Sequence, residues 1–270
     1  MFDTICKFLA ETFSADFATW LLGESIDLTE LSPSELSLEP IRADALILRQ
    51  SEQIVLHLEF QTEPKSDVPF RMADYRLRVY RRFPHKRMRQ VVVYLQQTNS
   101  ELVWQTRFTL ENTCHGFGVI RLWEQPVEVF LRSPGLLPFA VLSQTTDRPQ
   151  VLQQVAEAIT DLADPRVQSN IAASTAVLAG LVLEKALIRR LLRRELMQES
   201  VIYQDIKDEG RTEGRTEGRT EGRTEGRIEA QHEIAVKLLE EGIDLDTIAR
   251  VTGLTIEQIQ QLQERAAQDL

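Results

Sequence analysis

The sequence predicts a mixed α/β body followed by a small helical tail. Helix-like and strand-like runs alternate through the first part of the chain, and apolar helical segments follow them. A repetitive charged segment then separates this body from the last residues. We therefore expect a body over residues 1–204, a linker over 205–229 and a helical tail over 230–270.

The composition is that of a folded chain with a moderate excess of acid. The 270 residues are 43% hydrophobic, with 31 Lys+Arg against 41 Asp+Glu and a formal charge of −10. These values exclude a wholly disordered or fibrous chain and argue against a DNA-packaging protein coated in positive charge.

Cysteine use and hydropathy predict a cytoplasmic location. Cys6 and Cys114 form no CxxC pair, and no basic segment followed by an apolar run opens the chain. The longest weakly polar run, 171–183, has 13 residues, whereas a membrane span needs about 20. We expect no membrane association.

The body opens with a helical pattern over Phe2–Leu22, where apolar residues recur at helical spacing. Two strand-like runs follow, Arg42–Arg49 and Ile54–Gln61. A helical pattern over Arg71–Phe83 separates them from a third strand, Gln90–Leu95. Helix, hairpin, helix and strand in this order indicate a mixed sheet.

The rest of the body has two further strand candidates and two helices. The strand candidates are Val119–Trp123 and Val127–Leu131. The helical patterns cover Val151–Leu162 and Val167–Met197, and we expect both helices to pack on the sheet.

The first two strands bring together residues that could carry chemistry. A four-residue loop over Gln50–Gln53 would pair Arg49 with Ile54 and place Asp44 opposite Glu59. Gln61 would project from the same face as Glu59, because side chains alternate along a strand. Directly opposed carboxylates destabilise a sheet, and a bound Mg²⁺ would remove that repulsion. The alternative is a solvent-facing strand pair in which Arg42 is the partner of the acids.

These residues resemble a known group of enzymes. An Asp on one strand, then Glu-x-Gln (Glu59, Phe60, Gln61) on the next and a helix with Arg and Tyr, resembles the PD-(D/E)XK nuclease superfamily. The runs IVLHLEFQT and RMADYRLRVYRRFP, with the Gly-rich charged repeat and the short helical tail, more closely resemble its Rpn branch of recombination-promoting nucleases and transposase-like proteins.

The resemblance implies an αβββαβ core and Mg²⁺-dependent (or Mn²⁺-dependent) cleavage of DNA phosphodiesters, in recombination or transposition. It makes Asp44 and Glu59 metal ligands and puts Gln61 in the place of the superfamily's lysine, so that all three are catalytic residues. Gln61 is a departure, because an amide can orient a water but carries no positive charge. An acid on the first helix, Glu11 or Asp16, could complete the site.

The helix after this motif is strongly basic. Residues 71–89 contain eight Lys/Arg and one acid, a net +7, whereas the rest of the chain carries −17. Met72, Tyr75, Val79 and Phe83 have the spacing of a buried stripe. The arginines Arg71, Arg76, Arg78 and Arg82 are therefore expected to bind DNA phosphates without sequence preference; a solvated basic face is the alternative.

The repeat and the tail predict a spacer and a small module. Residues 209–228 repeat EGRT, with glycine at every fourth position, which disfavours a stable helix. In the tail, residues 246–260, with Gly253 in a turn and Thr255 as helix cap, resemble a helix-turn-helix. The second helix has Gln and Glu257 but no cation before Arg265, so a protein-binding or self-associating module is equally consistent with the sequence.

The sequence therefore predicts a metal-dependent DNA endonuclease of low sequence specificity that could form a homo-oligomer through its tail. Two alternatives remain open from the sequence: a catalytically silent DNA-binding accessory protein of recombination on the same fold, and a protein-interaction scaffold in which the acids are structural.

Overall fold

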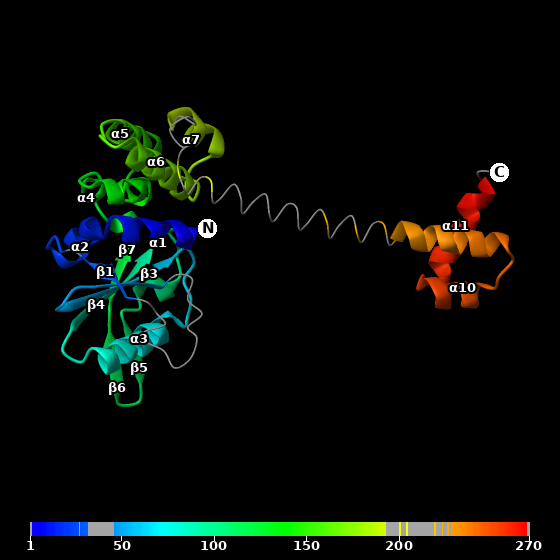
Figure 1. The fold of residues 1–270 in the computed structure, drawn as a ribbon, viewed down its shortest axis with the longest axis horizontal. Helices are drawn as coiled ribbons and strands as arrows, with labels where there is room; N and C mark the ends of the chain where they lie inside the picture. Colours follow the sequence, from blue (N-terminus) through cyan, green and yellow to red (C-terminus); the bar gives the residue numbers. More distant parts are fainter. Residues whose placement is uncertain are drawn as a thin grey trace. The chain divides into compact units, whose positions relative to one another are not determined.

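A computed structural model describes residues 2–26, 28–31, 46–192 and 228–268, together with positions 200, 204, 219, 223 and 226. The chain divides into two compact units, Met1–Ile206 and Lys207–Leu270. Figure 1 shows the first unit as a sheet with helices on both sides and the second as a group of helices. Most of the EGRT repeat lies outside the described residues, so the linker boundaries stay a prediction.

The first unit is built on a five-stranded sheet with the order β1-β2-β3-β4-β7. β1, β2 and β3 are antiparallel neighbours, whereas β4 and β7 run parallel to β3. These strands are β1 (Thr29–Glu30), β2 (Leu46–Gln50), β3 (Ile54–Gln61), β4 (Arg87–Tyr94) and β7 (Gly118–Arg121). The predicted mixed α/β body is confirmed.

The β2–β3 hairpin differs from the predicted register by two residues. Arg49 pairs with Leu56, and Leu46 lies opposite Glu59. The reason is a tighter turn, because the Ser51 amide donates to the Ile54 carbonyl at 2.9 Å and the Ser51 hydroxyl accepts from the Ile54 amide. The prediction that Asp44 faces Glu59 was therefore wrong in register, and Asp44 itself lies outside the described residues. A shift of two leaves every residue on its predicted face.

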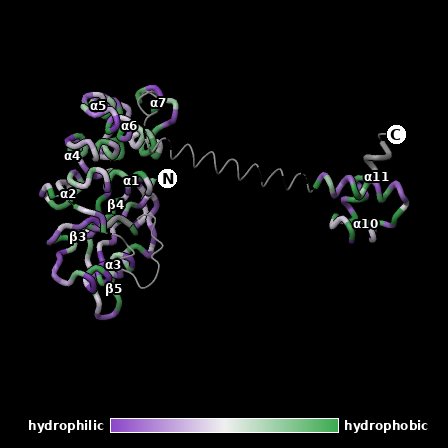
Figure 2. The backbone as a smooth tube through the Cα atoms, viewed as in Figure 1, coloured by the Kyte–Doolittle hydropathy of each residue, from purple (hydrophilic) through white to green (hydrophobic). Residues whose placement is uncertain are grey.

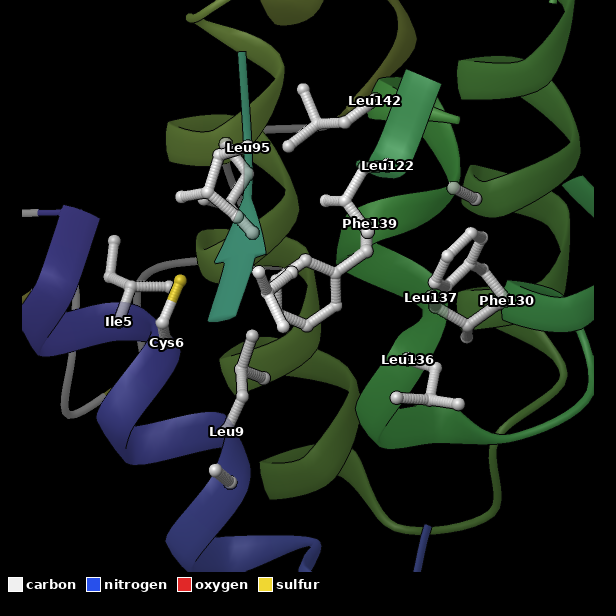
Figure 3. Packing of buried hydrophobic residues seen from close by; sticks show 14 of the residues in the cluster. Ile5, Cys6, Leu9, Leu95, Leu122, Phe130, Leu136, Leu137, Phe139 and Leu142 are labelled. Carbon is white, nitrogen blue, oxygen red and sulfur yellow. The ribbon is translucent and has the colours of Figure 1, made fainter. Parts of the chain in front are cut away.

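One face of the sheet carries the main core. Even-numbered β3 residues, such as Leu56 and Phe60, pack against helices from the N-terminal and the C-terminal parts of the unit's sequence. Figure 3 shows Ile5 and Leu9 on one side of this cluster and Phe139 near its middle. The elements over this face are α1 (Phe2–Thr12), α2 (Ser14–Leu22), α4 (Val127–Phe130), η4 (Pro134–Leu142), α5 (Arg148–Thr160), α6 (Pro165–Ala179) and α7 (Lys185–Leu191).

The opposite face is covered by α3 (Val68–Arg82) and by a two-stranded hairpin, β5 (Arg107–Leu110) and β6 (Thr113–Gly116). The predicted stripe of α3 is confirmed, since Met72, Tyr75 and Val79 are buried and Phe83 packs at its end. Two short 3₁₀ helices complete the unit, η2 (Glu101–Trp104) and η3 (Leu122–Glu124). α3 connects the parallel strands β3 and β4, so it must lead the chain back along one face of the sheet. On that face it covers the odd-numbered β3 residues.

Four predicted elements differ from the structure. The segment 2–22 is two helices that break at Phe13, where Gly135 comes so close that a Cβ on it would lie 2.3 Å from Phe13 Cβ. The predicted strand Val127–Leu131 is wrong, because these residues form α4 after Pro126. The predicted strand Val119–Trp123 ends early, at Arg121, and η3 follows. The predicted helix Val167–Met197 ends at Ala179, and 193–199 lie outside the described residues.

The second unit has helical residues 228–240, α10 (Leu245–Thr252) and α11 (Ile256–Gln268). Its core contains Ala235, Ile248, Leu254 and Ile259. Hydrophobic and hydrophilic stretches alternate along this unit in Figure 2, as amphipathic helices require. The predicted cap is confirmed: the Thr255 hydroxyl accepts from the Gln258 amide, and the Gln258 side chain accepts from the Thr255 amide at 2.9 Å.

Gly253 ends α10 in the left-handed conformation, with φ of 74°. Gly253→Ala is expected to destabilise the second unit by about 1–2 kcal/mol, because a side chain disfavours this conformation. Hydrogen exchange of the 244–262 amides measures the effect. Gly226→Ala is the matched control, since Gly226 has no left-handed φ and no atom near its Cβ position. Equal exchange in both variants would contradict the prediction.

Candidate active site

Three polar side chains of β3 lie on the face beneath α3. His57, Glu59 and Gln61 alternate with the apolar residues of the main core, and all three are buried, with 0%, 1% and 4% of their surface exposed. The strand is covered on both faces, which is why residues of such different polarity are equally buried. The shared face of Glu59 and Gln61 was predicted from alternation and is confirmed.

The Glu59 carboxylate has two close partners. Gln61 Nε2 donates to Glu59 Oε1 at 2.8 Å, and Arg71 Nη2 lies 2.9 Å from the same oxygen. Arg71 comes from the first turns of α3 and also approaches Asp67, at 3.6 Å. A buried carboxylate needs such compensation, so α3 supplies the positive charge that β3 lacks.

A hydrogen-bonded chain continues from His57 across the sheet. Gln90 Nε2 donates to the Met72 carbonyl at 2.8 Å and lies 2.9 Å from His57 Nδ1. Gln90 Oε1 lies 2.8 Å from His115 Nε2. Because a carbonyl only accepts, Gln90 Nε2 must donate, and Gln90 Oε1 accepts from His115.

This pattern assigns the histidine tautomers. His57 Nδ1 accepts from Gln90, so His57 carries its proton on Nε2, the nitrogen 3.9 Å from Glu59 Oε2. His57 Nε2 has no hydrogen-bond partner among the described residues. The sequence could indicate only that His57 shares a face with Glu59. Nothing in it pointed to Gln90 or His115, which meet His57 through the fold alone.

Two tyrosines border the carboxylate. Tyr75 packs edge-on against the His57 ring, with centroids 5.2 Å apart. Burial, followed by the negative charge of Glu59, raises the pKa of Tyr75 to about 12. Burial and Glu59 also raise the pKa of Tyr94. Both hydroxyls therefore stay protonated near neutral pH, and Tyr75 is a packing residue rather than an exposed stacking platform.

The four predicted DNA-binding arginines of α3 have different surroundings. Arg71 pairs with Glu59, and Arg78 Nε donates to Asp74 at 2.8 Å. Arg76 lies partly buried near the Tyr80 ring, and Arg82 is exposed beside Phe83. The basic helix therefore turns one arginine inward, to the carboxylate, and leaves others at the surface.

The donor set suits a hard divalent cation, because carboxylate and amide oxygens are the ligands that Mg²⁺ prefers. Glu59 and Gln61 supply such oxygens, whereas Asp44 lies outside the described residues. No cluster of three His, Cys, Asp or Glu side chains that could hold a metal occurs within the described ranges. A metal held by Asp44 and Glu59 therefore stays a prediction.

Neither candidate acid of the first helices reaches Glu59 through a described contact. Asp16 Oδ2 accepts from the Gly135 amide at 2.8 Å and so anchors η4. Glu11 forms an ion pair with Lys7 at 3.8 Å. The first interaction joins α2 to η4, the second lies within α1, and no described hydrogen bond joins either acid to the β3 carboxylate.

The comparisons with known proteins concern the tail. Residues 229–264 match the family model described as the Rpn/YhgA-like nuclease family, C-terminal HTH domain. The matched segment covers the helices around Gly253, so the predicted helix-turn-helix and the resemblance to the Rpn family are confirmed there. No curated protein and no solved structure matches the chain. Within the part of the chain that the structure describes, no helix has the length and apolar character that a membrane crossing needs.

Proposed function

We propose that this chain, a member of the Rpn/YhgA-like nuclease family by its C-terminal domain, is a divalent-metal-dependent DNA endonuclease of low sequence specificity that serves recombination or transposition. One observation carries the proposal: the buried Glu59 carboxylate, with Gln61 and Arg71 on one oxygen. The element order of helix, three strands, helix and strand supports a PD-(D/E)XK core around it.

Asp44 and Glu59 would hold the metal, Mg²⁺ or Mn²⁺. When bound, such an ion polarises a phosphodiester oxygen and lowers the pKa of a water ligand. Gln61 Nε2 is held by Glu59, so the Gln61 carbonyl oxygen is the group that orients an attacking water.

Arg71 supplies the charge that Gln61 lacks. A lysine in the place of Gln61 would bring a cation to the transition state, and here the guanidinium of α3 lies 2.9 Å from Glu59 Oε1 instead. Charge placed where negative charge develops is among the largest contributions to catalysis. The function of the superfamily's lysine would then be divided between an amide on the strand and an arginine on the helix.

The basic face of α3 and the tail would both bind DNA. Arg78 and Arg82, four residues apart, share one face of the helix that begins beside Glu59, and Arg76 lies on another face. Contacts from these arginines to phosphates would not read bases. The helix-turn-helix domain supports a DNA-related role. Its second helix offers exposed Gln258 and Gln260 rather than cations, and amides can contact adenine edges.

A second candidate function has its own observation. Only 2% of the Glu59 side chain is exposed, and an arginine already neutralises it. A buried and neutralised carboxylate of this kind would favour the second function, that of an accessory protein of recombination that binds DNA without cleaving it.

A plasmid assay tests the proposal and separates the two functions. Purified protein is incubated with supercoiled plasmid, with Mg²⁺ or Mn²⁺ and with a chelator. Nicking is expected only with metal, and Asp44→Ala is expected to abolish it, since Asp44 is one of the two carboxylates proposed to hold the ion. Asp161→Ala, an exposed acid at the end of α5, is the matched control.

One result would contradict the endonuclease, and another would contradict the proposed metal site. Intact plasmid with salt-sensitive binding by the wild-type protein would favour the accessory function. Cleavage that persists in Asp44→Ala would show that the metal site is elsewhere.

A further inference from the structure

A hollow lies on the α3 side of the sheet, apart from Glu59. It has a volume of about 470 Å³ and is lined by α3, β4, β6 and the segments around β5 and β7. Neither Glu59 nor Gln61 nor Arg71 lines it. Its described lining residues include three arginines and a histidine, namely Arg76, Arg89, Arg107 and His115. The described lining residues include no Asp or Glu. The hollow is therefore surrounded by positive charge without a counter-ion on its wall.

Arg76 gives the clearest sign that a negative group belongs there. Its Nη1 atom is buried and has no hydrogen-bond partner among the described residues. Asp74, the acid of α3, accepts from Arg78 instead. A buried charged donor without an acceptor is costly. Arg76 is one of the residues that line the hollow, so an oxoanion bound there would place an acceptor beside this guanidinium.

The pKa of His115 is a separate indication that the local charge is positive. Burial lowers the pKa of His115, and the nearby positive charge of Arg76 lowers it further. Among the described residues, no acid contributes to this shift in the opposite direction. The lowered pKa favours the neutral ring near neutral pH, and His115 Nε2 carries the proton that it donates to Gln90, so Nδ1 is unprotonated. A bound oxoanion would favour protonation of that nitrogen and gain another donor.

We propose that this hollow binds a phosphate group through Arg76, Arg89, Arg107 and His115. Guanidinium groups bind phosphate through paired hydrogen bonds, and the volume lies within the range of small-ligand sites. The phosphate could be free, or it could belong to the backbone of a bound DNA. Only binding of a DNA backbone phosphate rests on the proposed function. The positive charge of the hollow and the unpaired donor of Arg76 are present whether or not the chain cleaves DNA.

The first arm of the test uses inorganic phosphate and the full chain. Calorimetric titration is expected to show one saturable site, with affinity reduced at least about tenfold in Arg89→Gln and in Arg107→Gln. A lost charged contact of roughly 1.4 kcal/mol corresponds to that factor. Both arginines are exposed, so neither change removes a buried side chain. Arg132→Gln, an exposed arginine beside a different hollow, is the matched control and should bind phosphate as the wild type does.

The second arm uses a short DNA duplex and the same variants. If the ligand is a backbone phosphate, Arg107→Gln weakens duplex binding and reduces the salt dependence by about one counterion. If the ligand is free phosphate, duplex binding is unchanged while phosphate binding is lost.

The outcomes separate this proposal from the proposed function. Phosphate binding without any DNA binding or cleavage would support the hollow and contradict the nuclease. No saturable phosphate binding by the wild type, or equal binding by Arg89→Gln and Arg107→Gln, would overturn the phosphate site whatever the plasmid assay shows.

Discussion

Glu59→Gln is expected to reduce metal-dependent plasmid cleavage by about a thousandfold or more. The change keeps the size of the side chain but removes the charge that would hold the cation, and the metal contributes several kcal/mol to transition-state stabilisation. About 4 kcal/mol corresponds to a factor of about 10³ in rate. Cleavage rates at saturating Mg²⁺, followed by gel electrophoresis, measure the effect.

Two controls make this result specific. Glu101→Gln makes the same change at an exposed position in η2 and should leave the rate unaltered. Thermal unfolding tests whether the fold survives: Arg71 is partly exposed and keeps Asp67 as a partner, so the melting temperature should change by only a few degrees. Undiminished cleavage by a folded Glu59→Gln protein would exclude Glu59 as a metal ligand.

Phe139→Ala is expected to destabilise the first unit by about 3–5 kcal/mol, the usual cost of removing a buried aromatic ring. Phe139 is fully buried in η4. Its ring stacks on Phe60 at 5.8 Å and meets the edge of Phe17 at 6.0 Å. The ring thus joins η4, β3 and α2, and Figure 3 shows it near the middle of the core cluster.

The measurement is the free energy of unfolding of the full chain in urea, read from the transition of the first unit. Phe70→Ala is the matched control, because 57% of Phe70 is exposed and its one described ring contact is with Phe108, at 5.7 Å. A change below about 1 kcal/mol is expected there. Equal losses in the two variants would contradict the assignment of η4 to the core.

Local patterns in the sequence were sufficient for most of the elements. The α3 stripe through Met72 and Val79 has helical spacing, so burial of one face could be predicted without knowing what covers it. Alternation placed Glu59 and Gln61 on one face, because side-chain direction in a strand depends only on position. The tail was predicted for the same reason: Thr255 and Gly253 act within one turn of the residues they cap.

Elements whose form depends on distant partners were missed. The residues of η4 form an apolar run containing Pro134 and Pro138, which has no periodicity to recognise. Val127–Leu131 has the composition of a strand, but it follows Pro126 and forms α4, which packs against η4. The β2–β3 register depended on a tight turn closed by the Ser51 hydroxyl, for which the sequence offered an equally plausible longer loop.

The sequence by itself determined the order of helix, hairpin, helix and strand as far as β4, the separation of body from tail, and the candidate residues Asp44, Glu59 and Gln61, because spacing and residue type are local properties. Only the tertiary structure decided how the Glu59 charge is balanced. Arg71 belongs to another element, and it reaches Glu59 because α3 crosses the sheet between two parallel strands. The chain of Gln90 and His115, and the basic hollow beside it, likewise exist only because strands and helix meet in space.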